Sequence, residues 1–173
     1  MAIKIALAGP RGKMGTEAIK MITNYSNFEL VACIDRINDG KTLSEISHPS
    51  NLPIPIYERA EQCFNEVDID VFVDLTVPQA GYENTKIALQ HRIHSVVGTS
   101  GFTEEQIVDL SALAEENKVG CIIAPNFALG AVLMMLFSKI AAKYFPDVEI
   151  IEKHHDDKVD APRSEERRVG KEC

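Results

Sequence analysis

A short apolar run followed at once by spaced glycines most constrains the fold of this chain. Residues 3–8, IKIALA, have the length and composition of a buried strand, and Gly9, Gly12 and Gly15 follow where a helix is expected to begin. Glycine permits a tight turn, close approach of a pyrophosphate to the backbone, and close packing of the helix on the strand. This order predicts a nucleotide-binding βαβ unit whose helix N-terminus faces the phosphates.

The rest of the chain alternates between short apolar runs and longer helical stretches. The patterns predict strands at 28–35, 71–76, 94–99, 119–125 and 147–155, helices at 13–24, 79–91, 104–117 and 129–144, and a polar loop at 38–55. The strands at 71–76, 94–99 and 119–125 are apolar enough for both faces to be covered. Thr103 and Gln106 predict a capping box, and the apolar helix at 129–144 is expected to be buried between layers. The predicted fold class is α/β, a Rossmann-type doubly wound parallel sheet.

Composition excludes several classes of protein. The chain is 45% hydrophobic and 25% charged, which is typical of a globular protein. Its net charge of -8, without a basic stripe, argues against a nucleic-acid partner. No apolar segment approaches the about 18 residues of a membrane span, and no export signal is present, so we expect no membrane partner and a cytoplasmic location. Cys33, Cys63, Cys121 and Cys173 are then reduced thiols, mostly core filler.

An acidic residue follows the glycine loop at an informative distance. Asp35 ends the predicted second strand about 20 residues after the last glycine, where a carboxylate meets the adenosine ribose hydroxyls of a dinucleotide. Arg36 beside it has two interpretations, a partner for the 2′-phosphate of NADP or a solvated surface charge. The predicted cofactor is therefore NADPH or NADH, with the preference left open.

Small or polar residues stand at the ends of successive predicted strands. In an open parallel sheet these carboxyl ends line the ligand crevice, so the segments GTSG and APNF are candidates for the nicotinamide half of the site. The predicted cofactor-binding residues are Gly9, Gly12, Lys13, Met14, Gly15, Asp35, Arg36, Thr76, Gly98, Thr99, Ser100, Pro125, Asn126 and Phe127.

A cluster of titratable residues, EIIEKHHDDKVDAP, covers the last predicted strand and the segment after it. His154 is suited to proton transfer near neutral pH, and Lys158 to binding a carboxylate or assisting that transfer. The alternative is a polar loop with exposed histidines. No metal site is predicted, because adjacent histidines on a strand point to opposite faces.

This cluster resembles the signature of the 4-hydroxy-tetrahydrodipicolinate reductase (dihydrodipicolinate reductase) family of bacterial lysine and diaminopimelate biosynthesis, E-[IV]-x-E-x-H-x-x-x-K-x-D-x-P-S-G-T-A. The residues that match it are Glu149, Ile150, Glu152, His154, Lys158, Asp160 and Pro162. The segments AGPRGKMG, DLTVP, GTSGF and APNFALG are also similar to cofactor segments of the family.

The resemblance implies an NAD(P)H-dependent reduction of a small cyclic dicarboxylate, 4-hydroxy-tetrahydrodipicolinate. By this analogy His154 donates a proton, Lys158 assists and binds substrate, and His155 contacts a substrate carboxylate. It also implies a homotetramer for the full-length protein.

After Pro162 the chain departs from the family pattern. Ser-Gly-Thr-Ala is expected there, but Arg163, Ser164, Glu165 and Glu166 follow. We interpret 1–128 as the dinucleotide-binding domain, 129–162 as the start of an incomplete α+β substrate and oligomerisation domain, and 163–173 as a non-native tail. We therefore expect cofactor binding without appreciable turnover, and apolar surface exposed where the last helix lacks partners.

Two other functions remain open on the sequence. Another Rossmann oxidoreductase, such as a homoserine or sugar dehydrogenase, would not carry the His154 and Lys158 arrangement. A non-catalytic NAD(P)-binding module that senses redox state would bind the cofactor without needing that pair.

Overall fold

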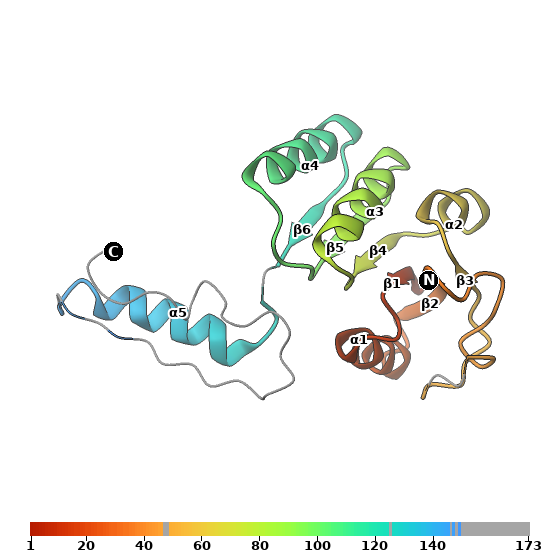
Figure 1. Ribbon diagram of the computed structural model, residues 1–173, viewed down its shortest axis with the longest axis horizontal. Helices are drawn as coiled ribbons and strands as arrows, with labels where there is room; N and C mark the ends of the chain where they lie inside the picture. Colours follow the sequence, from red (N-terminus) through yellow and green to blue (C-terminus); the bar gives the residue numbers. More distant parts are fainter. Residues whose placement is uncertain (47–48, 125, 146, 148, 150–173) are drawn as a thin grey trace. The chain divides into compact units, whose positions relative to one another are not determined.

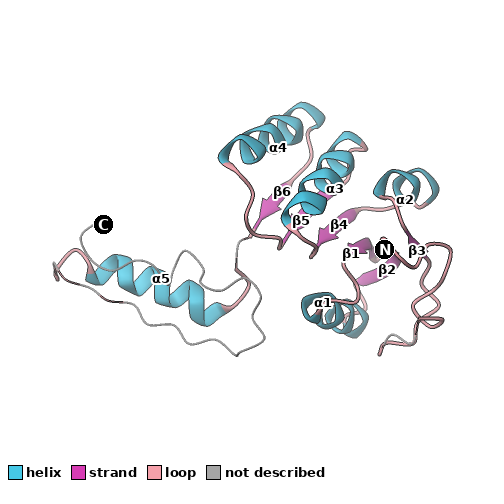
Figure 2. Ribbon diagram, viewed as in Figure 1, coloured by secondary structure: helices cyan, strands magenta, loops and turns pink. Residues whose placement is uncertain are grey.

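The structure, a computed structural model, describes residues 1–46, 49–124, 126–145, 147 and 149. It divides into two units, Met1–Pro125 and Asn126–Cys173. Figure 2 distinguishes the helices and strands of the first unit and shows the helix of the second.

A six-stranded parallel sheet forms the centre of the first unit. Its strands are β1 (Ile3–Ala8), β2 (Phe28–Ile34), β3 (Ile56–Tyr57), β4 (Val71–Asp74), β5 (His94–Val97) and β6 (Cys121–Ile123). The order across the sheet is β3-β2-β1-β4-β5-β6, and every pair is parallel. The predicted Rossmann-type sheet is confirmed. Strand order reverses between β1 and β4, so the ligand crevice of this fold is expected at their carboxyl ends.

Helices cover both faces of this sheet. They are α1 (Lys13–Asn24) on one face and α2 (Ala60–Glu66), α3 (Pro78–Gln90) and α4 (Glu104–Asn117) on the other (Figure 1). Successive side chains of β1 pack in hydrophobic clusters on opposite faces of the sheet, because side chains alternate along a strand. Ile5 and Leu7 pack in a cluster with Ile19 of α1, whereas Ala6 and Ala8 belong to a cluster on the other face with residues of α2 and α3.

Most predicted elements occur within a few residues of their expected bounds. The capping box of α4 is confirmed, since Gln106 N donates to Thr103 Oγ1 at 3.2 Å and Thr103 N donates to Gln106 Oε1 at 3.0 Å. The described part of 38–55 contains neither helix nor strand, as expected, only an isolated bridge between Thr42 and Pro55. Cys33 and Cys63 are buried core residues, also as expected. Neither β3 nor α2 was predicted.

Two predictions of burial are wrong. We expected β6 to be covered on both faces, but it is the last strand of the sheet, and Ile122 is 60% exposed. We also expected the apolar helix α5 (Leu129–Ala141) to lie between layers, but none of its residues is buried. A helix is buried only where another layer packs on it, and α5 is the only helix or strand in the described part of the second unit.

No helix among the described residues is long and apolar enough to cross a membrane.

Candidate functional site

The loop between β1 and α1 requires glycine at two positions for the fold itself. Gly9 has φ +82°, and a Cβ there would lie 2.6 Å from the carbonyl oxygen of Leu75. A Cβ on Gly15 would overlap the carbonyl oxygen of Gly9. Both contacts involve backbone that cannot yield, so these two glycines let β1, α1 and the end of β4 approach closely.

Gly12 differs, because the protein leaves space beside it. A Cβ on Gly12 would meet only the carbonyl oxygen of Gly9, at an ordinary contact distance of 3.5 Å. Gly12 is also the N-cap of α1, and no side chain caps this helix. Lys13 and Met14 are exposed beside it. An uncapped helix N-terminus, a neighbouring lysine and open space suit a pyrophosphate.

Asp35, directly after β2, has a buried carboxyl group that accepts hydrogen bonds from two side chains. Arg11 donates from Nε to Oδ2 and from Nη2 to Oδ1, the latter at 2.9 Å, and Asn38 Nδ2 donates to Oδ2 at 2.8 Å. Burial alone would raise the pKa of Asp35, but the hydrogen bonds and the charge of Arg11 outweigh it and lower this pKa below its ordinary value. The predicted acidic residue is therefore in place, with a guanidinium bound to it.

Sequence reasoning pointed to Arg36 and missed Arg11. Arg36 is exposed and makes no hydrogen bond or ion pair with any described residue. Arg11 reaches Asp35 because β1 and β2 are neighbouring parallel strands whose last residues, Ala8 and Ile34, are paired. The sequence signal for this contact was an arginine inside the glycine loop. The loop and the end of the second strand lie at the same edge of the sheet, so an arginine in the loop can reach Asp35.

The end of β4 lies between the glycine loop and the end of β5. Asp74, the last residue of β4, is paired with Ala8 on one side and with Val97 on the other. Leu75 N donates to the carbonyl oxygen of Ala8 at 3.1 Å. The structure thus brings the loop together with a set of predicted residues, Thr76, Gly98, Thr99 and Ser100, at one edge of the sheet.

Asp74 itself was not predicted. It is completely buried and accepts hydrogen bonds from the hydroxyls of Thr76 and Thr99, both at 2.7 Å, and from Asn84 Nδ2 at 3.2 Å. The sequence signal for it was an acidic residue within the otherwise apolar run VFVDL. An acidic residue in a buried strand needs hydrogen-bond donors around it, so such a residue indicates a polar cluster.

The remaining predicted residues belong to the second unit or lie at its boundary. Asn126 Oδ1 accepts a hydrogen bond from Ala128 N at 2.8 Å, and the side chain of Phe127 is exposed. The predicted residues Pro125, His154, His155 and Lys158 lie outside the described residues. Within the described ranges, no three His, Cys, Asp or Glu side chains are grouped so that they could hold a metal ion.

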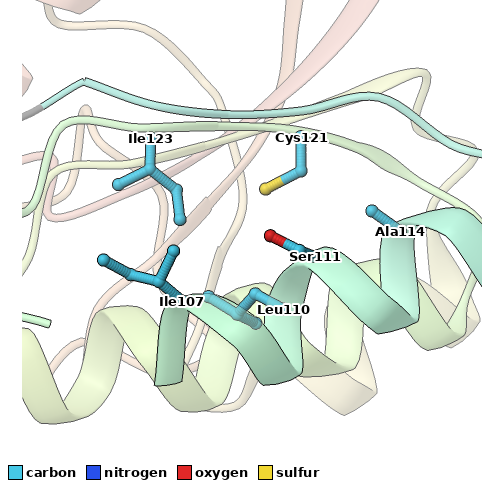
Figure 3. Close-up of a pocket in the computed structure, with 6 residues that line it drawn as sticks. All are labelled: Ile107, Leu110, Ser111, Ala114, Cys121 and Ile123. Atoms are coloured by element: carbon cyan, nitrogen blue, oxygen red, sulfur yellow. The ribbon is translucent and has the colours of Figure 1, made fainter. Parts of the chain in front are cut away.

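A cavity of about 360 Å³ lies between α4 and β6, at the edge of the sheet (Figure 3). Its lining is mostly apolar: Ile107, Leu110, Ser111, Ala114, Cys121 and Ile123. Burial raises the pKa of the Cys121 thiol, so this group is neutral at physiological pH. A cavity without charged groups does not suit a phosphate, and the candidate cofactor site is the glycine loop with the neighbouring strand ends.

Comparisons with known proteins show the family to which this chain is similar. Residues 3–127 match the model for the N-terminus of dihydrodipicolinate reductase, and residues 130–172 match the model for its C-terminus. The 4-hydroxy-tetrahydrodipicolinate reductases of Oceanobacillus iheyensis and Geobacillus kaustophilus are 58% and 57% identical to this chain over 163 and 162 residues. Each alignment covers 94% of this chain but only 62% and 61% of the relatives, so the chain spans about three fifths of their length.

Solved structures give the same relationship. A dipicolinate-bound dihydrodipicolinate reductase from a Paenisporosarcina species is 50% identical, with a TM-score of 0.77 over 95% of this chain and 62% of that one. A biliverdin reductase from Synechocystis, 16% identical with a TM-score of 0.66, covers 80% of this chain and 43% of its own and shares the fold alone. Because the two models together match most of its residues, the chain belongs to the dihydrodipicolinate reductase family.

Proposed function

We propose that this chain carries the NAD(P)H-binding part of a 4-hydroxy-tetrahydrodipicolinate reductase, an oxidoreductase of lysine and diaminopimelate biosynthesis. Family membership, together with the match to the family signature from Glu149 to Pro162, carries the proposal. The solved relative is described as dipicolinate-bound, and dipicolinate is a cyclic dicarboxylate. The proposed substrate is accordingly a small cyclic dicarboxylate.

The proposed cofactor contacts follow from the site. The N-terminus of α1 and the space beside Gly12 suit the pyrophosphate, Asp35 suits the adenosine ribose, and the segments after β4 and β5 suit the nicotinamide half. When bound, the reduced nicotinamide supplies the hydride for the substrate ring. Pro125, Asn126 and Phe127 are proposed to complete the nicotinamide side.

The proposed proton donor is His154, because an imidazole titrates near neutral pH and can give a proton to the reduced substrate. Lys158 is proposed to assist this transfer and, with His155, to bind substrate carboxylates through charged hydrogen bonds. Support for these roles is the position-by-position match of E-x-H-x-x-x-K.

Both NADPH and NADH are proposed as cofactors, since the ribose end of the site carries groups suited to each. The Asp35 carboxyl suits a ribose diol, whereas Arg11 and Arg36 suit a 2′-phosphate. The Arg11 side chain is 49% exposed and that of Asp35 only 7%, so Arg11 is the partner that can turn toward a ligand. Arg11 is therefore proposed to set the preference between the two nucleotides.

Titration of the purified chain with NADH and NADPH, followed by nicotinamide fluorescence, tests the cofactor proposal. Gly12→Val should bind both nucleotides at least tenfold more weakly, because its side chain occupies the space proposed for the pyrophosphate. It should still fold, because Gly12 has an extended backbone, φ -68° and ψ 159°, that valine adopts. The control is Gly130→Ala on α5, where a Cβ meets nothing within 4 Å and binding should not change. Failure of the wild-type chain to bind either nucleotide would overturn the proposal.

The catalytic role is tested in this chain extended to the length of its relatives. His154→Ala should lower kcat by about two to four orders of magnitude, the usual contribution of a positioned proton donor. The chain of 173 residues alone is expected to bind cofactor without appreciable turnover. An extended enzyme with unchanged kcat would rule out His154 as the donor, and an extended protein that binds cofactor without any reductase activity would favour the redox-sensing module.

A further inference from the structure

We propose that Asp74 is a positioning residue for the nicotinamide half of the cofactor, a role that rests on the proposed NAD(P)H site. Asp74 is the last residue of β4, at the carboxyl edge of the sheet. It is paired with Ala8, which leads into the glycine loop, and with Val97, which leads into the segment 98–101. Its buried carboxyl group thus lies where three segments proposed to hold the cofactor come together: the glycine loop and the turns after β4 and β5.

Asp74 joins the turns that follow β4 and β5. Its Oδ1 accepts hydrogen bonds from the hydroxyl and the backbone N–H of Thr76, at 2.7 and 3.0 Å, and from the hydroxyl of Thr99, at 2.7 Å. Its Oδ2 accepts a hydrogen bond from Asn84 Nδ2 of α3 at 3.2 Å. All these described partners are neutral donors, so one buried carboxyl group connects both turns to α3.

Helix α3 closes over this group without leaving space for a side chain at Gly81. A Cβ on Gly81 would lie 2.9 Å from Asp74 Oδ1 and 3.1 Å from Thr99 Cγ2. The carboxyl group is therefore covered by the helix and does not itself contact a ligand. Hydrogen bonds in such a covered site are strong, and leaving one unmade is costly, so the cluster is a rigid support.

The segments fixed by this support are those proposed to meet the nicotinamide. Thr99 is buried between Gly98 and Ser100, which are partly exposed at the sheet edge. Thr76 lies beside the glycine loop, since a Cβ on Gly9 would come within 3.4 Å of Thr76 Cγ2. Displacement of these turns moves the nicotinamide contacts, whereas the adenosine contacts, at Asp35 on the other side of β1, stay in place. Asp74 should therefore matter for one half of the cofactor only.

Asp74→Asn in this full chain tests the proposal with two ligands. Asparagine keeps an oxygen that can accept hydrogen bonds from the two threonine hydroxyls. Its NH₂ group, however, faces the NH₂ group of Asn84, and two donors cannot form a hydrogen bond with each other. NADH affinity, measured by fluorescence, should fall at least tenfold. Affinity for ADP-ribose, which lacks the nicotinamide, should stay within twofold of wild type by calorimetry. The double variant Asp74→Asn with Asn84→Asp restores a donor and acceptor pair and should recover most of the NADH affinity.

Thr99→Val provides a second test with the core volume preserved, and it should also weaken NADH without affecting ADP-ribose. The matched control is Thr85→Val on α3, because Thr85 is also buried but its hydroxyl has no hydrogen-bond partner in the described structure. This control should bind both ligands as wild type does. Equal loss of both ligands in Asp74→Asn, or unchanged NADH affinity in Asp74→Asn and Thr99→Val, would overturn the positioning role. If wild type binds no NADH, the proposed function fails instead.

Discussion

At the residue scale, the contact between Arg11 and Asp35 links the proposed cofactor site to the stability of the fold. Asp35 is buried, so its carboxyl group needs donors, and Arg11 supplies two of them. A nucleotide that uses Asp35 must share these donors or displace them. The same residue pair is therefore proposed to contribute both to folding and to the choice of nucleotide.

This contact predicts a pH-dependent difference between wild type and Arg11→Ala. The pKa of Asp35 is lowered in the folded protein, so the stabilisation from its charged form is present above its ordinary pKa of 3.8 and is lost as pH falls through the folded pKa. Because Arg11 is half exposed, we expect Arg11→Ala to lose about 1 kcal/mol at neutral pH. Urea unfolding at several pH values should show this difference shrinking below about pH 4.

Arg36→Ala is the control for this measurement, since Arg36 makes no hydrogen bond or ion pair with any described residue and its removal should not change the free energy of unfolding. A difference between wild type and Arg11→Ala that stayed constant from neutral to acidic pH would mean that Arg11 stabilises the fold through packing and not through Asp35. The same variants would also separate the two arginines in NADPH binding, where Arg11→Ala should lose more affinity for NADPH than for NADH.

At the element scale, the sequence predicted those elements whose signals are local. The first strand and the helix at 104–117 have the predicted bounds, because an apolar run and a capping box lie within the elements themselves. The unpredicted elements are short. β3 has two residues that pair only with β2, and α2 has seven, too few for a helical period to emerge.

The residues of the candidate site also differ in whether a local sequence signal predicted them. The glycine loop and Asp35 form a pattern along the chain and were predicted. Arg11 and Asp74 were missed because their roles depend on which strands are neighbours. β1 lies beside β4 although β2 and β3 come between them in the sequence, and only this order places Asp74 against the strand that leads into the loop. Local spacing does not contain that information.

At the scale of the whole molecule, the exposure of α5 contradicts the predicted burial of this helix between layers. Apart from Ser138 and Lys139, the helix consists of apolar residues and glycine, a composition typical of buried helices. Its exposed side chains include Leu129, Val132, Leu133, Met135, Leu136, Phe137 and Ile140. The sequence also led us to expect apolar surface where this helix lacks partners, and that expectation is confirmed. A soluble protein seldom presents such a contiguous apolar surface without a partner covering it.

This surface predicts self-association of the 173-residue chain. Sedimentation velocity over a range of concentrations should give a larger average mass as concentration rises, because association removes apolar side chains from water. Leu136→Lys with Phe137→Lys should shift the protein toward monomer, since both side chains are more than half exposed and the charges oppose burial. Val108→Lys on α4 is the control, because Val108 is 68% exposed but lies outside α5. A monomer at every concentration, or an equal effect of the control, would show that α5 does not drive association.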